Sequence, residues 1–509
     1  MRGFPAVLLT LALAGCAGAA ARPVPDSPGA AQAAICRVAL QRIDAAIREE
    51  GASDAEAYRI PGFPYLRSNR FLASFGGRDL GPEAFEAWID RLQALDEQGR
   101  SIEFANLDAK AGRRLDRKIA DATWPGWGVA EVASRCPPVL RRHDFARDQG
   151  WDRLRAAVAV PDDYSALERI LGLYPLTAIP VALGYERWQA ENLPAFEVGF
   201  GHEVWQGTPV LFTPGGEPPS LAPAGIARII ERSRANPLDI PEPPAAGLQH
   251  LAEAFAPAFL IDIASDADRI GRPYWTRSAL PEVDTGRPVA FVRLSHAFLE
   301  GRPAVQLVYV VWFRSRPKQA ALDLLGGPLD GLIWRVTLGN DGRPVVYDTI
   351  HPCGCYHLFF PAPGTRRLPL PQDAASDIRE TELVPQAAPA LIEGERLVVR
   401  LQSVSHFVTG LAPEGALASE VAAQDYRLLL GNPTPDEALR SMPLPQGGYR
   451  SLYGPDGLVE GSERLERFIF WPMGIESAGA MRQWGRHATA FVGRRHFDDP
   501  FLLQEAFAP

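Results

Sequence analysis

One short segment of the chain concentrates the side chains best suited to metal binding or sulfur chemistry. Between Asp348 and His357 the sequence reads DTIHPCGCYH, and His351, Cys353, Cys355 and His357 occupy alternate positions. In an extended strand, alternate side chains point to the same face. Imidazole and thiolate groups are ligands that suit zinc or copper. The spacing therefore predicts a Cys/His metal site, with zinc or copper as the candidate metal.

A single straight strand cannot bring all four ligands to one metal. Each residue advances about 3.3 Å along a strand, so the first and fourth ligands would lie about 20 Å apart. Pro352 and Gly354 can bend the chain between them, and histidines from other strands can complete the site. His296 and His406 are the candidates for that role. Tetrahedral zinc takes four such ligands, or three together with a water that it activates.

The same residues allow three other interpretations. Cys353 and Cys355 can close a Cys-Gly-Cys disulfide, a small ring that would be reduced more easily than an ordinary bridge. One of the two cysteines can instead be a nucleophile activated by a nearby histidine. The histidines can also simply form hydrogen bonds within a sheet. The sequence leaves these alternatives open, and with them the question of whether the protein is an enzyme.

Composition and missing motifs exclude several function classes. The chain of 509 residues carries 52 basic and 61 acidic side chains, a formal charge of -9, and no basic stripe offsets it. A nucleic-acid partner is therefore not expected. The sequence contains no Gly-rich phosphate loop and no Gly-x-Ser-x-Gly motif, so nucleotide and serine-hydrolase chemistry lack their usual support.

The N-terminus indicates the cellular compartment. After Arg2 comes an apolar run, too short to cross a bilayer, that ends in Leu13-Ala14-Gly15-Cys16. These last four residues resemble the lipobox of bacterial lipoproteins, and the resemblance covers only this end of the chain. It implies that residues 1–15 are a signal peptide, that Cys16 is acylated, and that Ala17 directs the protein to the outer membrane, facing the periplasm. The alternative is a plain secretory signal ending in the small residues 17–19.

The other four cysteines form an even set in an oxidising compartment. Two of them, Cys36 and Cys136, flank a predicted helical region, and two lie one residue apart at Cys353 and Cys355. The economical pairing is Cys36 with Cys136, which would stabilise the fold by about 4–5 kcal/mol in the chain-entropy model. The alternative is two free buried thiols.

Hydrophobic periodicity divides the chain into an α+β arrangement. A flexible tether over residues 16–33 precedes a mostly helical domain at 34–244, an antiparallel β-rich domain at 245–430, and a mixed C-terminal region at 431–509 that packs on it. Helices are predicted at 31–50, 82–98, after an N-cap at Ser165, and at 223–233 and 245–254. Two hairpins are predicted, joining 288–296 to 304–313 and 332–338 to 344–350, with another strand at 396–404. The β domain should form a sandwich or barrel-like structure.

Together these features predict a lipid-anchored cell-envelope protein with a Cys/His metal site in its β domain. If the site is catalytic, the reaction expected is metal-assisted hydrolysis of an envelope component. The alternative is a non-catalytic envelope binding or assembly lipoprotein in which Cys353 and Cys355 form a structural disulfide. The expected partners are the membrane, through the lipid anchor, and either an envelope protein or a small-molecule ligand.

Overall fold

The structure is a computed structural model that describes residues 28–216, 219, 221–369, 380–417, 421–430 and 439–509. Cys16, the expected signal peptide and the tether up to residue 27 lie outside the described residues. Helix α1 begins at Pro28, so residues 28–33, expected in the tether, are helical. Alanine dominates this stretch and has the highest helix propensity, which extends α1 upstream of its amphipathic part.

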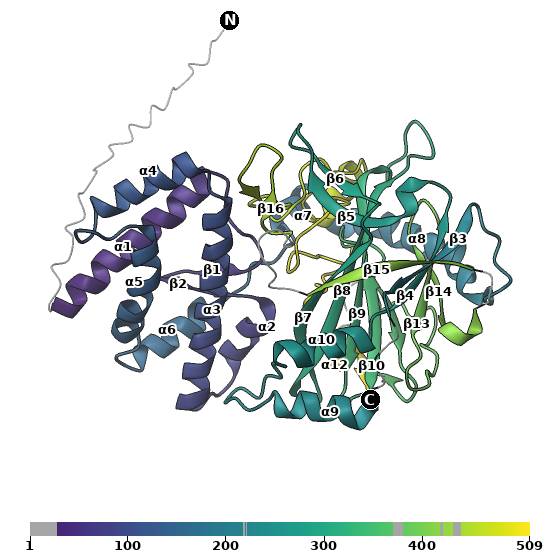
Figure 1. The fold of residues 1–509 in the computed structure, drawn as a ribbon, viewed down its shortest axis with the longest axis horizontal. Coiled ribbons are helices and arrows are strands. Elements are labelled where there is room, and N and C mark those ends of the chain that lie inside the picture. Colours follow the sequence, from purple (N-terminus) through teal and green to yellow (C-terminus); the bar gives the residue numbers. More distant parts are fainter. Residues whose placement is uncertain (1–27, 217–218, 220, 370–379, 418–420, 431–438) are drawn as a thin grey trace, which may run out of the picture.

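Helices packed around a two-stranded hairpin make up the N-terminal unit, on the left of Figure 1. Its elements are α1 (Pro28–Glu49), β1 (Tyr58–Ile60), β2 (Phe63–Ser68), α2 (Arg70–Ala73), α3 (Pro82–Asn106), α4 (Ala109–Ala120), α5 (Val129–Asp144) and α6 (Gln149–Ala157). Leu40, Phe85, Trp88 and Leu140 are completely buried in its core. The two helices predicted from residues 31 and 82 are confirmed, and the second is longer than expected.

A disulfide joins α1 to α5 in this unit. It links Cys36 to Cys136 across a sequence separation of 100 residues, as the sequence predicts. Both cysteines are completely buried among the apolar side chains of the core. A bridge that closes so long a loop is worth about 4–5 kcal/mol in the chain-entropy model.

A twelve-stranded mixed sheet dominates the rest of the molecule and curls into a half-barrel (Figure 1). Its main path runs β11-β10-β9-β8-β7-β15-β3-β4-β13-β14, with β5 and β6 attached beside β8. The strands are β3 (Thr208–Pro214), β4 (Ala258–Ile263), β5 (Ile270–Trp275), β6 (Pro281–Asp284), β7 (Val289–Leu299), β8 (Arg302–Arg316), β9 (Gly327–Leu338), β10 (Pro344–Ile350), β11 (Leu358–Pro361), β13 (Leu397–Leu401), β14 (Val408–Pro413) and β15 (Ala422–Leu430). The α+β class, with a helical N-terminal region before a β-rich domain, is thus confirmed.

The sheet is not purely antiparallel, because three of its strand pairs are parallel. Strand β15 pairs in parallel with both β3 and β7, and β13 pairs in parallel with β4. The sequence missed β3, which lies in the region expected to be helical. Long connections bring β3 and β15 into the sheet, and such crossovers permit parallel neighbours that hairpins do not.

Both predicted hairpins are present as β7–β8 and β9–β10. The register of each strand pair fixes which polar side chains lie opposite one another. Arg335 lies directly opposite Asp348 on β9 and β10, and Asp330 lies opposite Phe313 on β9 and β8.

Short helices and the C-terminal region cover the sheet. The predicted helices α9 (Pro223–Arg232) and α10 (Ala245–Ala254) contribute Ile226, Ile230 and Leu251 to the main core. The C-terminal elements α12 (Leu502–Ala506) and β18 (Phe507–Ala508) pack against β10 and β11. The end of the chain, residues 502–508, therefore packs on the β domain.

A helical hairpin links the two units. Helix α7 (Ala166–Leu171) begins after the predicted cap, Ser165, whose hydroxyl accepts a hydrogen bond from the Glu168 amide. Helix α8 (Tyr174–Asn192) follows after a two-residue turn. The hairpin contacts the 3-10 helix η7 (Trp471–Met473), which continues the short helix α11 (Arg467–Phe470).

Candidate functional site

The Cys/His segment forms a tight turn between β10 and β11. The His351 amide donates to the Cys355 carbonyl at 3.0 Å, and the Gly354 amide donates to the His351 carbonyl at 2.8 Å. Gly354 has φ +86°, and a Cβ on it would lie 2.5 Å from the Ala488 carbonyl oxygen, so only glycine fits. We refer to residues 351–357 as the dithiol turn. It confirms a bend at Gly354.

The two thiols of this turn contact each other. Cys353 and Cys355 are not joined in a disulfide, and they are only 8% and 7% exposed. Their mutual hydrogen bond, together with burial, raises the pKa of Cys355 well above its usual range. A narrow crevice, too small to admit a water molecule, borders Cys353 but not Cys355; it is lined by Gly354, Ile475, Ala478, Gly479, Ala488, Thr489 and Phe491.

The two histidines of the segment turn away from each other towards different carboxylates. His351 Nδ1 lies 3.3 Å from Asp330 Oδ1, and His357 Nε2 lies 3.0 Å from Asp348 Oδ2. Asp348 is itself fixed by Arg335, whose Nε donates to it at 2.8 Å. Burial lowers the pKa of His357 to about 3, so this ring is neutral. The bend therefore separates the two imidazoles instead of converging them.

His406 joins His351 through a shared carboxylate. His406 Nδ1 lies 2.8 Å from Asp330 Oδ2, and its Nε2 lies 3.4 Å from Asp268 Oδ1. Carboxylates and imidazoles therefore alternate along a buried row, which runs Asp268, His406, Asp330, His351. We name this row the imidazole–carboxylate chain. His351 Nε2 is buried and makes no hydrogen bond within the described residues.

Burial and neighbouring charges set the protonation of this chain. Burial disfavours a charge on His406, but Asp268 and Asp330 outweigh it and raise the pKa of His406. Burial also opposes ionisation of Asp330, yet His351 and His406 hold its pKa well below the usual value. The pKa of His351 is lowered because burial dominates. The two imidazoles of the chain are thus shifted in opposite directions, His406 towards the protonated form and His351 towards the neutral form.

His296 does not belong to the site. It lies on β7, where a ring nitrogen is 2.7 Å from the Pro241 carbonyl and the ring stacks on Phe71 of the helical unit. It therefore packs between the two units of the molecule.

The six candidate metal ligands do not converge. Within the described residues no group of three or more His, Cys, Asp or Glu side chains could hold a metal ion. The physical reason is that Asp330 and Asp348 draw His351 and His357 apart, while the two thiols occupy the turn between them.

Three further side chains reach the dithiol turn from distant segments. Tyr356 Oη accepts a hydrogen bond from Arg316 Nη1 at 3.0 Å, and the charge of Arg316 acts on Asp330 and Cys353. Burial raises the pKa of Glu466 to about 7, and its charge acts on Cys355. Trp188 of α8 packs against the Tyr356 ring, with centroids 5.3 Å apart, and covers this side of the turn.

The backbone around these groups is strained. Among the described residues, nine that are not glycine have positive φ, and four of them flank this site. They are Leu329, Tyr356, Val404 and His406. Such left-handed residues cost free energy and persist where the surrounding structure demands them, often at functional sites. Sequence reasoning missed Asp330, Arg316 and Glu466, because no local motif marks them.

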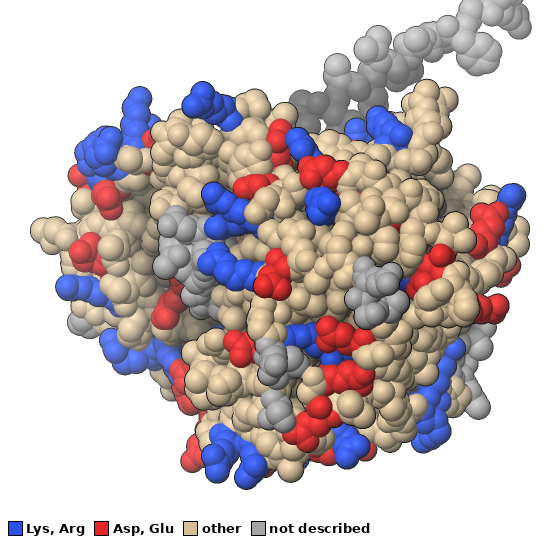
Figure 2. Space-filling model, turned by 45° about the vertical axis from the view of Figure 1, so that its right-hand side comes forward, with Lys and Arg blue, Asp and Glu red and all other residues tan. Residues whose placement is uncertain are grey.

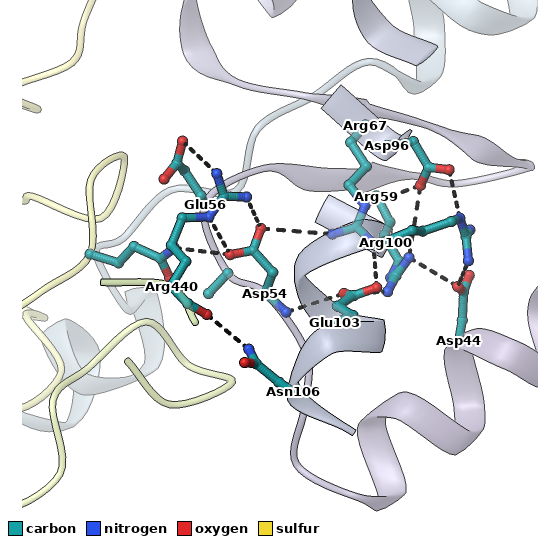
Figure 3. Close-up of polar contacts among 12 residues, drawn as sticks. Asp44, Asp54, Glu56, Arg59, Arg67, Asp96, Arg100, Glu103, Asn106 and Arg440 are labelled. Atoms are coloured by element: carbon teal, nitrogen blue, oxygen red, sulfur yellow. Dashed lines mark hydrogen bonds and ion pairs between the residues drawn. The ribbon is translucent and has the colours of Figure 1, made fainter. Parts of the chain in front are cut away.

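A second buried polar cluster lies between the helical unit and the C-terminal region (Figure 3). We call it the Arg/acid network; its five carboxylates and five guanidinium groups are Asp44, Asp54, Glu56, Asp96, Glu103, Arg59, Arg67, Arg100, Arg293 and Arg440. Arg67 is completely buried and pairs with Asp96 at 3.1 Å and Glu103 at 2.7 Å. Equal numbers of opposite charges leave this network electrically balanced.

No protein-family model, no curated protein and no solved structure matches the chain. Within the described part of the chain, no helix has the length and apolar character needed to cross a membrane. Figure 2 shows basic and acidic side chains mingled over the face in view, without an extended area of one sign.

Proposed function

We propose that the chain is a lipid-anchored cell-envelope protein, attached at Cys16 to the outer membrane and facing the periplasm, with a thiol–disulfide redox site at Cys353 and Cys355. The observation that carries the redox assignment is the contact between two unpaired thiols on one tight turn. The turn geometry already brings the sulfurs together, so a disulfide needs no large movement of the chain.

The chemistry is an exchange with a disulfide of a partner protein. The Cys353 thiolate attacks one partner sulfur, and a partner thiolate leaves and takes up a proton. The Cys355 sulfur then loses its proton and attacks the Cys353 sulfur, which releases the second partner thiol. Two electrons and two protons pass from the dithiol to the partner disulfide.

The surroundings suit these roles. Cys353 interacts with the positive charges of Arg316 and Arg482 and is the sulfur that borders the surface crevice. Cys355 is kept as a thiol until the second step. Glu466 titrates near neutral pH and is the group that would take its proton.

A redox titration tests the assignment, with the Cys36–Cys136 bridge as an internal control. The protein is equilibrated in buffers of defined potential, alkylated and digested, and each cysteine pair is read by mass. We expect Cys353 and Cys355 to interconvert between about -120 and -270 mV, the range of thiol oxidoreductases, while the other bridge stays closed to below about -300 mV. If the Cys353–Cys355 bridge opens only at the potential at which the Cys36–Cys136 bridge opens, it is a structural disulfide and the proposal is wrong. Thiols at Cys353 and Cys355 that never pair would also overturn the proposal.

Single serine variants distinguish the two sulfurs. Cys355→Ser should leave a Cys353 that reacts readily with maleimide, whereas Cys353→Ser should leave a slowly reacting Cys355. Equal rates for the two variants would contradict the assigned order of attack.

The anchor has its own test. Replacing Cys16 with Ala should abolish incorporation of labelled palmitate and leave residues 1–15 attached to the chain. Normal processing in this variant would instead support the secretory signal that ends at residues 17–19.

A further inference from the structure

The helical hairpin α7–α8 carries an exposed apolar surface that no other part of the described chain covers. Ten large apolar side chains on α7, α8, the turn between them, α11 and η7 are between 40% and 71% exposed. They are Leu167, Ile170, Leu171, Leu173, Leu176, Ile179, Leu183, Phe468, Ile469 and Trp471. We refer to these ten residues as the apolar patch.

The patch is continuous although its two parts are some 300 residues apart in sequence. The end of α7 lies directly on η7: a Cβ added to Gly172 would be only 2.4 Å from the Cβ of Pro472. The Ser165 amide donates to the Gly474 carbonyl at 2.7 Å, which ties the start of α7 to the same segment. The exposed side chains of the hairpin and of η7 therefore border one another.

The hairpin is held rigidly, so its apolar face stays outward. Arg169 donates to the Met473 and Gly493 carbonyls at 2.8 and 2.7 Å, and its guanidinium lies over the rings of Tyr164 and Tyr174. In α8 only Ala178 is fully buried. The other end of α8 is fixed by Trp188 on the β domain.

The composition of the patch fits a lipid surface. From Ile170 to Tyr185 the sequence contains no charged side chain, so this stretch offers a partner protein no ionic contact. Trp471, which is 40% exposed, belongs to the patch together with these aliphatic residues, as aromatic residues do at membrane interfaces. Large contiguous apolar patches exposed on protein surfaces mark interaction sites.

The expected anchor supplies the membrane. Residues 17–27 separate Cys16 from α1, and even fully extended they reach about 40 Å. A body of this length has a radius of gyration of about 23 Å, so an acylated Cys16 keeps it within about one molecular diameter of the bilayer. We propose that the apolar patch docks on the bilayer and orients the body there, an inference that rests on the proposed lipid anchor.

Photolabelling from within the bilayer tests this docking. The acylated full-length protein is reconstituted in vesicles of phosphatidylethanolamine and phosphatidylglycerol that contain a lipid with a diazirine on its acyl chain. After irradiation, labelled peptides are mapped by mass spectrometry. We expect peptides of residues 166–185 and 467–473 to be labelled at least about tenfold more than the charged helix α4, because only the patch enters the hydrocarbon.

Variants with charges in the patch provide the comparison. The triple variant Leu176→Asp, Ile179→Asp and Leu183→Asp should lose this labelling yet still sediment with the vesicles through its acyl groups. The corresponding neutral variant, with asparagine at the same three positions, should lose most of the labelling. The matched control is Val38→Asp on α1 with Ile392→Asp, two exposed aliphatic residues outside the hairpin and the α11–η7 segment, which should label like wild type.

Sedimentation and labelling separate the two proposals. A protein that sediments with vesicles while its hairpin labels no more than α4 would overturn the docking and leave the anchor standing. A labelled hairpin on a chain without acyl groups would support docking and overturn the anchor. A stable dimer whose interface shields residues 166–185 from the label would assign the patch to a second copy and overturn the docking.

Discussion

The Arg/acid network and the dithiol turn are both buried and polar, but they differ in every property that matters for chemistry. The network joins five carboxylates and five guanidinium groups in ion pairs of opposite charge. The dithiol turn and its neighbours contain thiols, imidazoles and a carboxyl whose pKa is about 7. Of these groups, the Glu466 carboxyl is the one whose pKa places its change of protonation near neutral pH.

The cysteines repeat this difference. In the helical unit Cys36 and Cys136 are bridged within an apolar core, whereas Cys353 and Cys355 are adjacent thiols beside titratable groups. Left-handed backbone flanks the second pair. One buried cluster therefore stabilises the joint between two units, and the other has the composition of a reactive site.

The largest expected effect separates the two cysteine pairs. Replacing Cys36 and Cys136 together with serine should lower the free energy of unfolding by about 4–5 kcal/mol, measured by urea denaturation under oxidising conditions. Replacing Cys353 and Cys355 in the same way should cost only about 1–2 kcal/mol, because no loop constraint is lost. Equal losses would remove the distinction between the two pairs.

The Arg/acid network should respond strongly to the loss of one partner. Arg67→Met leaves Asp96 and Glu103 buried without their common cation and should cost about 3–5 kcal/mol. The control is Arg114→Met, which breaks the exposed pair with Glu50 and should cost less than about 1 kcal/mol. If the two variants unfold at the same urea concentration, the network has no structural role.

The pH dependence of stability distinguishes the clusters in a third way. The raised pKa of Glu466 means that, between about pH 4.5 and 7, the folded protein binds more protons at this group than the unfolded chain does. The contribution of Glu466 to stability is therefore lost as the pH rises through this window, by up to roughly 3 kcal/mol. The stability of Glu466→Gln relative to wild type should rise by that amount between pH 5 and 8.

Glu103 provides the matched control for this titration. Burial opposes its ionisation, but Arg67 and Arg59 outweigh burial and lower its pKa, so its stabilising effect is present above about pH 4.5 and lost only in acid. Glu103→Gln should therefore destabilise the protein by a constant amount from pH 5 to 8. If the stability difference between Glu103→Gln and wild type instead changes from pH 5 to 8 as it does for Glu466→Gln, the two clusters titrate alike.

Local patterns in the sequence predicted the local parts of the fold. The two hairpins, the helices from residues 31 and 82, and the cap at Ser165 follow from periodicity and turn chemistry within a few residues. The Cys36–Cys136 pairing followed from the count and spacing of cysteines. Strand β3 was missed because it is short and lies between helices, where only its distant neighbours β4 and β15 define it.

The candidate site shows the limit of such patterns. The segment from His351 to His357 was identified, but its histidines were expected to share a metal and instead face Asp330 and Asp348. Asp330 is recruited by strand register, and nothing near it in sequence marks it. Asp268 ends the short 3-10 helix η3 (Asp266–Asp268) after β4, and only the fold brings it to His406. Left-handed backbone at Val404 and His406 is likewise a product of tertiary packing.

The position of β15 has a consequence for how the chain folds. This strand, Ala422–Leu430, is inserted between β3 and β7, which lie more than 120 residues earlier in the sequence. Contacts of such high contact order form slowly, because a long loop must close before any of them contributes. Until β15 arrives, β3 and β7 each present an unpaired edge that can recruit other chains. Folding intermediates of this protein should therefore be vulnerable to aggregation, and a chaperone that shields strand edges would raise its folding yield.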